Sequence, residues 1–469
     1  MKKVAIFAVA AAALVLLALP PVLGTLTESQ VRARIAALDA SGVLKASVRS
    51  YERGWFRSRA RISLALAPHT IARLDELGAA LGLPPLAADL DRHLPLALEI
   101  AHGPLALLDG AYFGWSKIVA RPDSLARNVA SLEEGLGVPY LFEFRGRTSF
   151  TGGVSFDASL PMVDLAADGV HVAFSGGGID GALVGQRLVP DSRAGDFVLT
   201  SPPGAVTIRN VLAATDIELG SSNVLPGDAK LSIERLSIVD AERGDSPVLD
   251  AANVKIASKV GLDPHTTLLD LHATYDSESV LLYGTRVADA SVGIALDKID
   301  VAAFDTYLRL LEKVSVGADS SAEVGKALAH TLAAGPSFTI DPLRFRIDGE
   351  PFTAHLEIAA NPATFAATGS VDLDNWLALL PALRSTVTVD LSKKLAHEMA
   401  ALTAEMRYVD DGMPPEQRRL LADAQAGLML VTLISQGILV DAGDTYRAEL
   451  RLADGALTLN GGPLPFDLP

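Results

Sequence analysis

The chain has no cysteine among its 469 residues. This absence excludes disulfides, thiolate nucleophiles, zinc fingers, iron–sulfur ligation and a lipidated N-terminal cysteine. Aromatic residues are also few, at 6%, whereas hydrophobic residues make up 49% of the chain. A chain of this length and apolar content has room for two to four domains or one elongated repetitive body, and its stability must come from packing.

Basic residues are outnumbered, with 40 Lys and Arg against 56 Asp and Glu, giving a net charge of -16. This charge repels phosphate backbones and excludes nucleic acid as a partner. The motifs of common hydrolases are missing as well. No G-x-S-x-G is present, and His397-Glu398 lacks the second histidine of a zincin helix. The sequence therefore predicts no catalytic residue, no metal site and no cofactor, and thus a protein that is not an enzyme.

Three glycines match a nucleotide-binding pattern. Gly176, Gly178 and Gly181 satisfy G-x-G-x-x-G, but residues 182–189 reach Pro190 without a helical pattern. The anion site of that motif needs a helix N-terminus. A glycine hairpin is therefore favoured over a dinucleotide site.

Two histidines lie close to two aspartates near a predicted strand. His265 and His272 accompany Asp263 and Asp270. The two histidines are an odd number of residues apart, so a regular strand would point them to opposite faces. Scattered surface polar residues are favoured over a metal site.

The chain begins with a short basic segment and a long uncharged one. Met1, Lys2 and Lys3 precede an uncharged run from Val4 to Leu26. A helix of roughly 20 apolar residues crosses a hydrocarbon core of about 30 Å, and the lysines would stay cytoplasmic. We therefore expect a transmembrane anchor over residues 1–26, in a single-pass protein with its body across the membrane from the lysines. A cleaved signal peptide is the alternative.

Alternation of apolar and polar residues predicts paired strands along most of the body. Residues 44–66 form a first hairpin, and residues 140–300 form an antiparallel meander of short strands. The clearest hairpin has Leu343, Phe345 and Ile347 before an Asp348-Gly349 turn. An Asp454-Gly455 turn predicts another hairpin near the end of the chain.

Amphipathic helices are expected between these strands. The first spans residues 27–38, with Val31, Ile35 and Leu38 on one side; others are expected over 304–314, 322–334, 391–408 and 414–437. The helix over 391–408 carries the apolar face singled out as a candidate site. Its members are Leu391, Leu395, Met399, Leu402 and Met406.

Together these patterns predict a β-dominated α+β fold. We expect an elongated antiparallel sheet whose one apolar face is covered by amphipathic helices, preceded by a transmembrane helix. The predicted regions are the anchor (1–26), an N-terminal α+β region (27–139), the meander (140–300) and a strand-pair-plus-helix region (301–469). Large exposed apolar areas are rare, so helices, a second sheet or an apolar ligand must cover this face. Packing by helices is favoured, and lipid in a groove is the main alternative.

The most distinctive local signal is Arg53, Gly54, Trp55 and Phe56. It predicts a tight turn with Gly54 at positive φ and an aromatic ring capping the end of the sheet. The alternative places these aromatics at a rim facing the membrane, where Trp is favoured.

Four segments in series carry a family resemblance: SYERGWFRSRA (50–60), AHGPLAL (101–107), VAFSGG (172–177) and YRAELRLADGALTLNGGPLPF (446–466). With them the chain resembles the YdgA-like family of bacterial envelope proteins. The resemblance implies an inner-membrane anchor and a periplasmic β-rich body, and supplies no catalytic residues. The terminal segment is also faintly similar to AsmA-like envelope proteins, whose grooves are associated with phospholipid movement.

The favoured function is a non-enzymatic envelope protein whose apolar groove receives lipid or another amphipathic ligand. The alternative is a structural scaffold that binds envelope proteins through its sheet edges. An enzyme ranks third, because it would need ionisable clusters that the spacing does not reveal. The identity of the ligand, the partners and the oligomeric state stay open.

Overall fold

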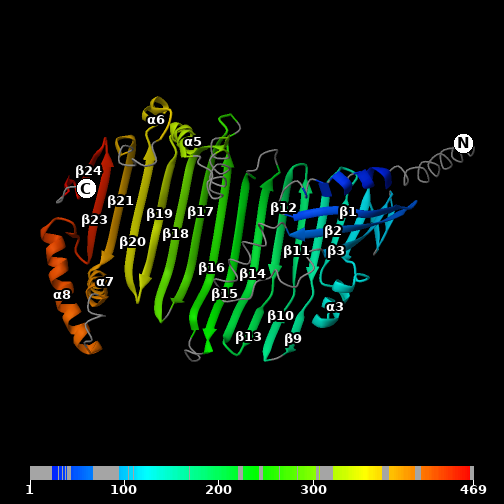
Figure 1. The fold of residues 1–469 in the computed structure, drawn as a ribbon, viewed down its shortest axis with the longest axis horizontal. Coiled ribbons are helices and arrows are strands. Elements are labelled where there is room, and N and C mark those ends of the chain that lie inside the picture. Colours follow the sequence, from blue (N-terminus) through cyan, green and yellow to red (C-terminus); the bar gives the residue numbers. More distant parts are fainter. Residues whose placement is uncertain are drawn as a thin grey trace, which may run out of the picture. The chain divides into compact units, whose positions relative to one another are not determined.

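The computed structural model describes residues 44–66, 94–302, 321–371, 380–406 and 414–464, residue 306 and parts of 24–39, with gaps at 104, 109, 168, 220–224, 242–246, 264 and 283. The chain divides into two compact units. Unit 1 comprises residues 1–202 and 209–216, and unit 2 comprises residues 203–208 and 217–469. Figure 1 shows that both are built mainly from strands, which confirms the β-dominated prediction. The four regions expected from the sequence stay a prediction.

Unit 1 contains a run of eight strands, each antiparallel to the next. In spatial order they are β1 (Leu44–Arg53), β2 (Arg57–Leu66), β3 (Leu94–His102), β6 (Ser116–Pro122), β7 (Glu143–Thr148), β8 (Val154–Leu160), β11 (Gly177–Val184) and β12 (Arg187–Ala194).

Smaller elements complete unit 1. Strand β10 (Val170–Phe174) lies between β9 (Val163–Ala167) and β13 (Phe197–Ser201), and β4 (Leu105–Leu107) pairs with β5 (Ala111–Phe113). The helix α3 (Arg127–Leu136) follows β6, and β14 (Gly204–Glu218) contains residues of both units.

The core of unit 1 lies over β2, β3 and β6. Ile62, Leu98 and the completely buried Ile100 belong to one apolar cluster, against which Val31 and Ile35 pack. These two residues lie in a helical segment, so the amphipathic helix expected over 27–38 is confirmed for them; Leu38 lies outside the described residues. This end of the sheet has a closed, side-chain-filled core.

The expected transmembrane helix over residues 1–26 is corrected. Within the part of the chain that the structure describes, no helix combines the length and the apolar character needed to cross a bilayer. Gly24 packs against the ring of His102, and the hydroxyl of Thr25 lies 3.2 Å from Nη1 of Arg53. The end of the uncharged run is therefore joined to the polar contacts of unit 1. Residues 1–23 lie outside the described residues.

Unit 2 is a meander of long strands that pair with their neighbours. In spatial order they are β15 (Gly227–Asp240), β16 (Pro247–Leu262), β17 (Leu268–Leu282), β18 (Thr285–Asp300), β19 (Ser337–Ile347), β20 (Glu350–Ala360), β21 (Leu383–Ser392), β23 (Thr445–Ala453), β24 (Ala456–Leu459) and β25 (Gly462–Pro463).

Helices are inserted between the later strands of unit 2. They are α5 (Ser321–Ala333), α6 (Pro362–Thr368), α7 (Lys393–Met406) and α8 (Pro415–Ser435); the short β22 (Val440–Asp441) also pairs with β23. The helix expected over 322–334 is thereby confirmed, whereas residues 304, 305 and 307–314 of the one expected over 304–314 lie outside the described residues.

Two predicted turns are confirmed. Asp348 and Gly349 have φ values of 49° and 88°, and Asp454 and Gly455 have 51° and 76°. Positive φ at both central residues is what a two-residue hairpin of type I′ needs, because its twist matches that of the strands. These turns join β19 to β20 and β23 to β24.

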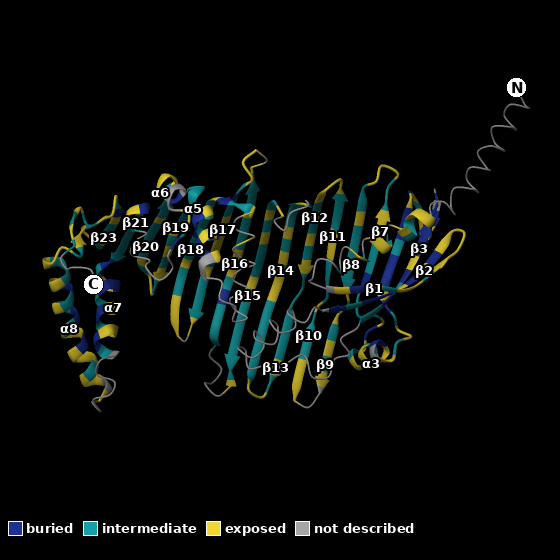
Figure 2. Cartoon of the chain, turned by 45° about the horizontal axis from the view of Figure 1, so that its top comes forward, coloured by how far each residue is buried: buried dark blue, intermediate teal, exposed yellow. Residues whose placement is uncertain are grey.

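The expected helical cover of the apolar face is not found among the described helices. Helices α7 and α8 pack against one another through Ala396, Ala400 and Ala426, and reach the sheet at Leu391 and Tyr446. Helices α5 and α6 pack at the start of β21. Figure 2 shows that most strand positions in unit 2 are only half-buried. The described helices cover the ends of strands and leave the middle of the sheet.

The glycine pattern forms a hairpin, as expected. Gly176 lies at a turn with φ of 86°, and Gly178 and Gly181 lie within β11, which pairs with β12. A Cβ on Gly181 would lie 2.4 Å from Cζ of Phe156 in the neighbouring strand β8. This glycine therefore leaves room for an aromatic ring and has no part in a phosphate site.

Replacing Gly181 with Ala should lower the free energy of unfolding by about 1 to 3 kcal/mol, because the added methyl group overlaps Phe156. Urea unfolding followed by circular dichroism measures the change. Gly135→Ala, in α3 with no atom within 4 Å of the new Cβ, is the matched control and should be neutral or stabilising. A Phe156→Ala background should remove most of the cost of Gly181→Ala; an unchanged cost would contradict the packing explanation.

Candidate functional site

The register of unit 2 aligns apolar side chains into rows across the strands. Directly paired residues in antiparallel strands point to the same face. One row contains Ala273, Ile294, Ile340, Leu356, Val387 and Leu450. A second contains Ile256, Tyr275, Val292, Leu343, Ala354 and Val389, and a third contains Val260, Leu271, Leu296, Phe338 and Ile358. We call these three rows the apolar face.

The opposite face of the same strands is polar. One of its rows contains Lys255, Asp276, Ser291, Arg344, Thr353 and Asp390. Nε of Arg447 donates to Oδ1 of Asp390 over 2.8 Å, and this hydrogen bond raises the pKa of Arg447. Paired charges on this face are therefore suited to contact with water.

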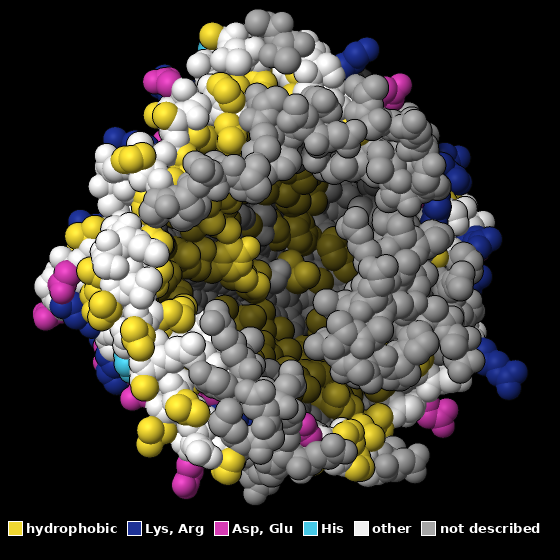
Figure 3. All heavy atoms as spheres, turned by 60° about the vertical axis from the view of Figure 1, so that its left-hand side comes forward, with side chains coloured by type: hydrophobic (Ala, Val, Ile, Leu, Met, Phe, Trp, Pro, Cys, Tyr) yellow, Lys and Arg dark blue, Asp and Glu magenta, His cyan; other side chains and the backbone are white. Residues whose placement is uncertain are grey.

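The described residues cover the middle of the apolar face incompletely. Ile294, Ile340 and Leu356 are half-buried, unlike the completely buried Ile100 of unit 1. Hydrophobic side chains line a hollow in Figure 3. Seven strands spaced by about 4.8 Å span about 29 Å, roughly twice one leaflet of a hydrocarbon core of about 30 Å. An acyl chain can lie across this surface.

Unit 1 carries a separate apolar cavity of about 330 Å³. Its lining includes Phe142, Leu160, Ile179 and Val211. This volume lies at the lower end of the range of ligand pockets, about 300 to 1,000 Å³. The cavity suits a small apolar group. Among its described lining residues, only Arg193 is charged.

A larger cavity of about 800 Å³ lies along the polar face of unit 2. Its charged residues include Lys255, Asp276, Asp289, Arg344 and Arg346, and Arg346 lies 3.6 Å from Asp289. Both signs of charge are present and partly paired. This arrangement does not bring a nucleophile, a base and an oxyanion donor together as catalysis requires.

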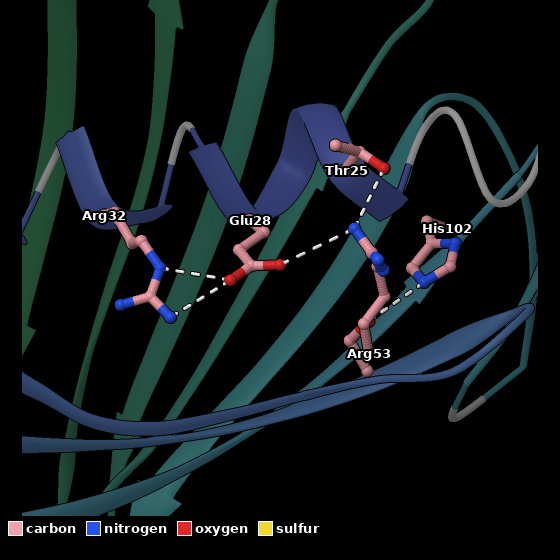
Figure 4. A network of polar contacts seen from close by, with 6 residues as sticks. Thr25, Glu28, Arg32, Arg53 and His102 are labelled. Atoms are coloured by element: carbon pink, nitrogen blue, oxygen red, sulfur yellow. Dashed lines mark hydrogen bonds and ion pairs between the residues drawn. The ribbon is translucent and has the colours of Figure 1, made fainter.

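The turn singled out from the sequence lies between β1 and β2. Figure 4 shows Arg53 directed toward Thr25 and Glu28, and its Nη1 lies 3.9 Å from Oε2 of Glu28. Trp55 and Phe56 are exposed. Gly54 is not at positive φ, so that prediction is wrong; glycine is required because a Cβ would lie 2.3 Å from the carbonyl oxygen of Arg57.

The structure divides the five residues of the candidate helix face. Leu391 lies in β21, and Leu395 is buried with 2% exposure. Met399 and Leu402 are 50% and 61% exposed, and the side chain of Met406 lies outside the description. The helix instead buries its alanines against α8, since small residues let two helices approach closely. These five residues therefore do not form one binding face.

The histidines form contacts that join parts of the fold. Nε2 of His272 lies 3.1 Å from Asp297, and Nε2 of His397 lies 2.7 Å from Asp423, which joins α7 to α8. Asp263 accepts hydrogen bonds from the backbone of His265 and from Thr266, and these lower its pKa. No group of three potential metal ligands occurs among the residues the structure describes.

Sequence reasoning missed a set of aromatic residues near the β1–β2 turn. Phe113 and Phe150 have ring centroids 5.1 Å apart, and Trp115 donates its indole N–H to the carbonyl of Phe150 over 3.1 Å. Phe113 ends β5, whereas Phe150 lies in the turn between β7 and β8, so these residues are far apart in sequence. Aromatic residues beside glycines at 113–115 and 150–153 were the available signal.

Leu→Ala substitution distinguishes an uncovered apolar face from a filled core. Leu395→Ala should cost about 3 kcal/mol of unfolding free energy, because it leaves a cavity. Leu356→Ala, at a half-buried position of the same unit, should cost about 1 kcal/mol or less. Urea unfolding of the ligand-free protein measures both, and equal costs would mean that the apolar face is a closed core.

Comparison with known proteins places the chain in a family without assigning it a chemistry. No curated protein matches it. The family model described as "Bacterial protein of unknown function (DUF945)" matches residues 1–467, which is nearly the whole sequence. The chain therefore belongs to DUF945, a bacterial family of unknown function.

Proposed function

We propose that this protein binds a lipid or another amphipathic molecule, with the acyl chain lying on the apolar face of unit 2. The supporting observation is the row of half-buried aliphatic side chains at Ile294, Ile340 and Leu356, in the middle of a sheet that the described helices do not cover. A contiguous apolar surface in water is costly unless something covers it. A flexible hydrocarbon chain meets this need without specific polar contacts.

The absence of a reaction centre in the described residues supports a binding function over catalysis. The two cavities differ in character, one apolar and one lined by paired charges, and neither gathers a recognisable set of reacting groups. The headgroup of the bound molecule would stay in water at the edge of the sheet, near the side chains of the polar face. We therefore propose a carrier or holder of lipid rather than an enzyme.

A scaffold that binds other envelope proteins is the second candidate. It would use unpaired sheet edges, which the short β25 at the end of unit 2 offers. Stoichiometric cross-linking of a protein, without retained lipid, would favour this alternative.

We further propose that the chain is a YdgA-like member of DUF945 and works in the cell envelope. The supports are the four sequence segments quoted above and the basic, uncharged-apolar leading segment, which is typical of exported proteins. Fractionation of cells with detection of the full chain tests the location; recovery in the cytosol alone would contradict it.

Lipid retention by the full-length protein tests the proposed function. Lipids extracted from purified protein are quantified by mass spectrometry per mole of chain. The triple variant Ile294→Gln/Ile340→Gln/Leu356→Gln should retain about tenfold less lipid, because three amides in an apolar site lack partners.

The matched control is Ala295→Gln/Thr339→Gln/Thr386→Gln. Ala295 and Thr339 lie one position from Ile294 and Ile340 in the same strands, and Thr386 of β21 continues their row on the opposite face through Glu357 of β20. Circular dichroism of both variants checks folding. Equal retention by both variants, or no lipid in the wild-type protein, would contradict the proposed function.

A further inference from the structure

One end of the unit 1 sheet carries exposed aromatic residues brought together by the strand register. Arg57 pairs with Ala101, His102 with Ser116, and Ser116 with Thr148, so several strand ends meet at one edge. The exposed residues at this edge are Trp55, Phe56, Leu107, Phe113, Trp115 and Phe150. We call them the aromatic rim.

Direct contacts connect the parts of the aromatic rim. The backbone N–H of His102 donates to the carbonyl of Phe56 over 3.0 Å, and Arg57 donates to the carbonyl of Leu107 over 2.5 Å. Trp115 and Phe150 have ring centroids 6.5 Å apart. Exposure of the side chains ranges from 37% at Trp115 to 73% at Phe113. The rim is thus one surface and not scattered apolar residues.

The rim differs from the rest of the chain in charge. Its segments, 54–56, 105–108, 110–115 and 149–153, contain no charged residue and six aromatic ones. The whole chain is 20% charged and 6% aromatic, with a net charge of -16. Asp109, between two of these segments, lies outside the described residues. Arg53 and Arg57, which flank the first of these segments, are basic, so this edge of an acidic protein can approach a bilayer without repulsion by anionic headgroups.

The longest uncharged run of the chain reaches the fold at this same edge. Gly24, at the end of that run, lies so close to His102 that a Cβ would be 2.8 Å from Cε1 of the ring. Thr25 contacts Arg53, which directly precedes the Gly54-Trp55-Phe56 turn. The described end of this uncharged run therefore lies beside the aromatic rim.

We propose that the aromatic rim docks unit 1 on a lipid bilayer, with its rings in the interfacial region. Trp is favoured at this depth because the ring is apolar and its N–H is polar. Binding then depends on buried apolar area more than on charge. The proposal goes beyond lipid binding by unit 2, since it rests on other residues and predicts contact with a bilayer surface rather than with one lipid molecule.

Tryptophan fluorescence of the full-length protein tests the docking. The chain has three tryptophans, so Trp376→Phe leaves only Trp55 and Trp115, both in the rim. Vesicles of equal parts phosphatidylcholine and phosphatidylglycerol, with brominated acyl chains, should quench this variant and shift its emission to shorter wavelength. The variant Trp55→Phe/Trp115→Phe, which keeps Trp376, measures the signal that does not come from the rim. Rim tryptophans that are neither quenched nor shifted in the Trp376→Phe variant would overturn the proposal.

Vesicle flotation measures the contribution of the rim to binding. Trp55→Ser/Phe113→Ser should weaken binding about tenfold, and salt should change it little. The control Leu125→Ser/Met162→Ser removes residues that are 83% and 74% exposed and follow the opposite ends of β6 and β8. If both variants bind like wild type, or a cross-linked protein covers the rim instead, docking on lipid is wrong. The rim variant should still retain lipid on unit 2, so failure of docking and failure of lipid binding are distinguishable.

Discussion

The antiparallel register is the constraint on which the rest of this structure depends. Each strand alternates apolar and polar residues, and pairing places partners on the same face. The pairs Ile294 with Ile340 and Ile340 with Leu356 turn local alternation into a surface that crosses many strands. A shift of one residue in any pairing would interrupt every row, because neighbouring positions point to opposite faces. The apolar face therefore exists only as a property of the assembled sheet.

The two units deal with apolar surface in different ways. In unit 1, Val31 and Ile35 of the N-terminal helical segment pack on the sheet and complete a buried cluster around Ile100. In unit 2, α7 and α8 bury much of their apolar surface against each other and cover only strand ends. The half-buried rows of unit 2 are the physical reason for assigning a ligand to that unit, and the exposed aromatic rim is the reason for assigning a membrane contact to unit 1.

Much of the strand structure could be predicted from the sequence, because it is encoded locally. The Asp-Gly pairs at 348–349 and 454–455 predict hairpins, because aspartate and glycine accept positive φ more readily than most residue types. The alternation at 343–347 likewise gave the correct face of β19. Such signals depend on neighbouring residues and need no knowledge of distant contacts.

The errors of prediction arise where contacts between residues distant in sequence determine which side chains are buried. Helix α7 carries Met399 and Leu402, which are more hydrophobic than alanine, yet buries Ala396 and Ala400 because α8 approaches closely there. Glycine is required at position 54 because the carbonyl of Arg57 leaves no room for a Cβ, and not because of a positive φ. The aromatic rim combines turns that are about 40 to 95 residues apart in sequence, so no local pattern reveals it.

Photocross-linking with a lipid that carries a diazirine in its acyl chain tests the central claim most directly. Peptide mapping of the labelled protein resolves which side chains face the lipid along one strand. Binding on the apolar face predicts labels at Phe338, Ile340 and Leu343 of β19, and none at Thr339 between them or at Arg344 directly after them. Labels on Thr339 and Arg344, or equal labelling of both faces, would contradict it.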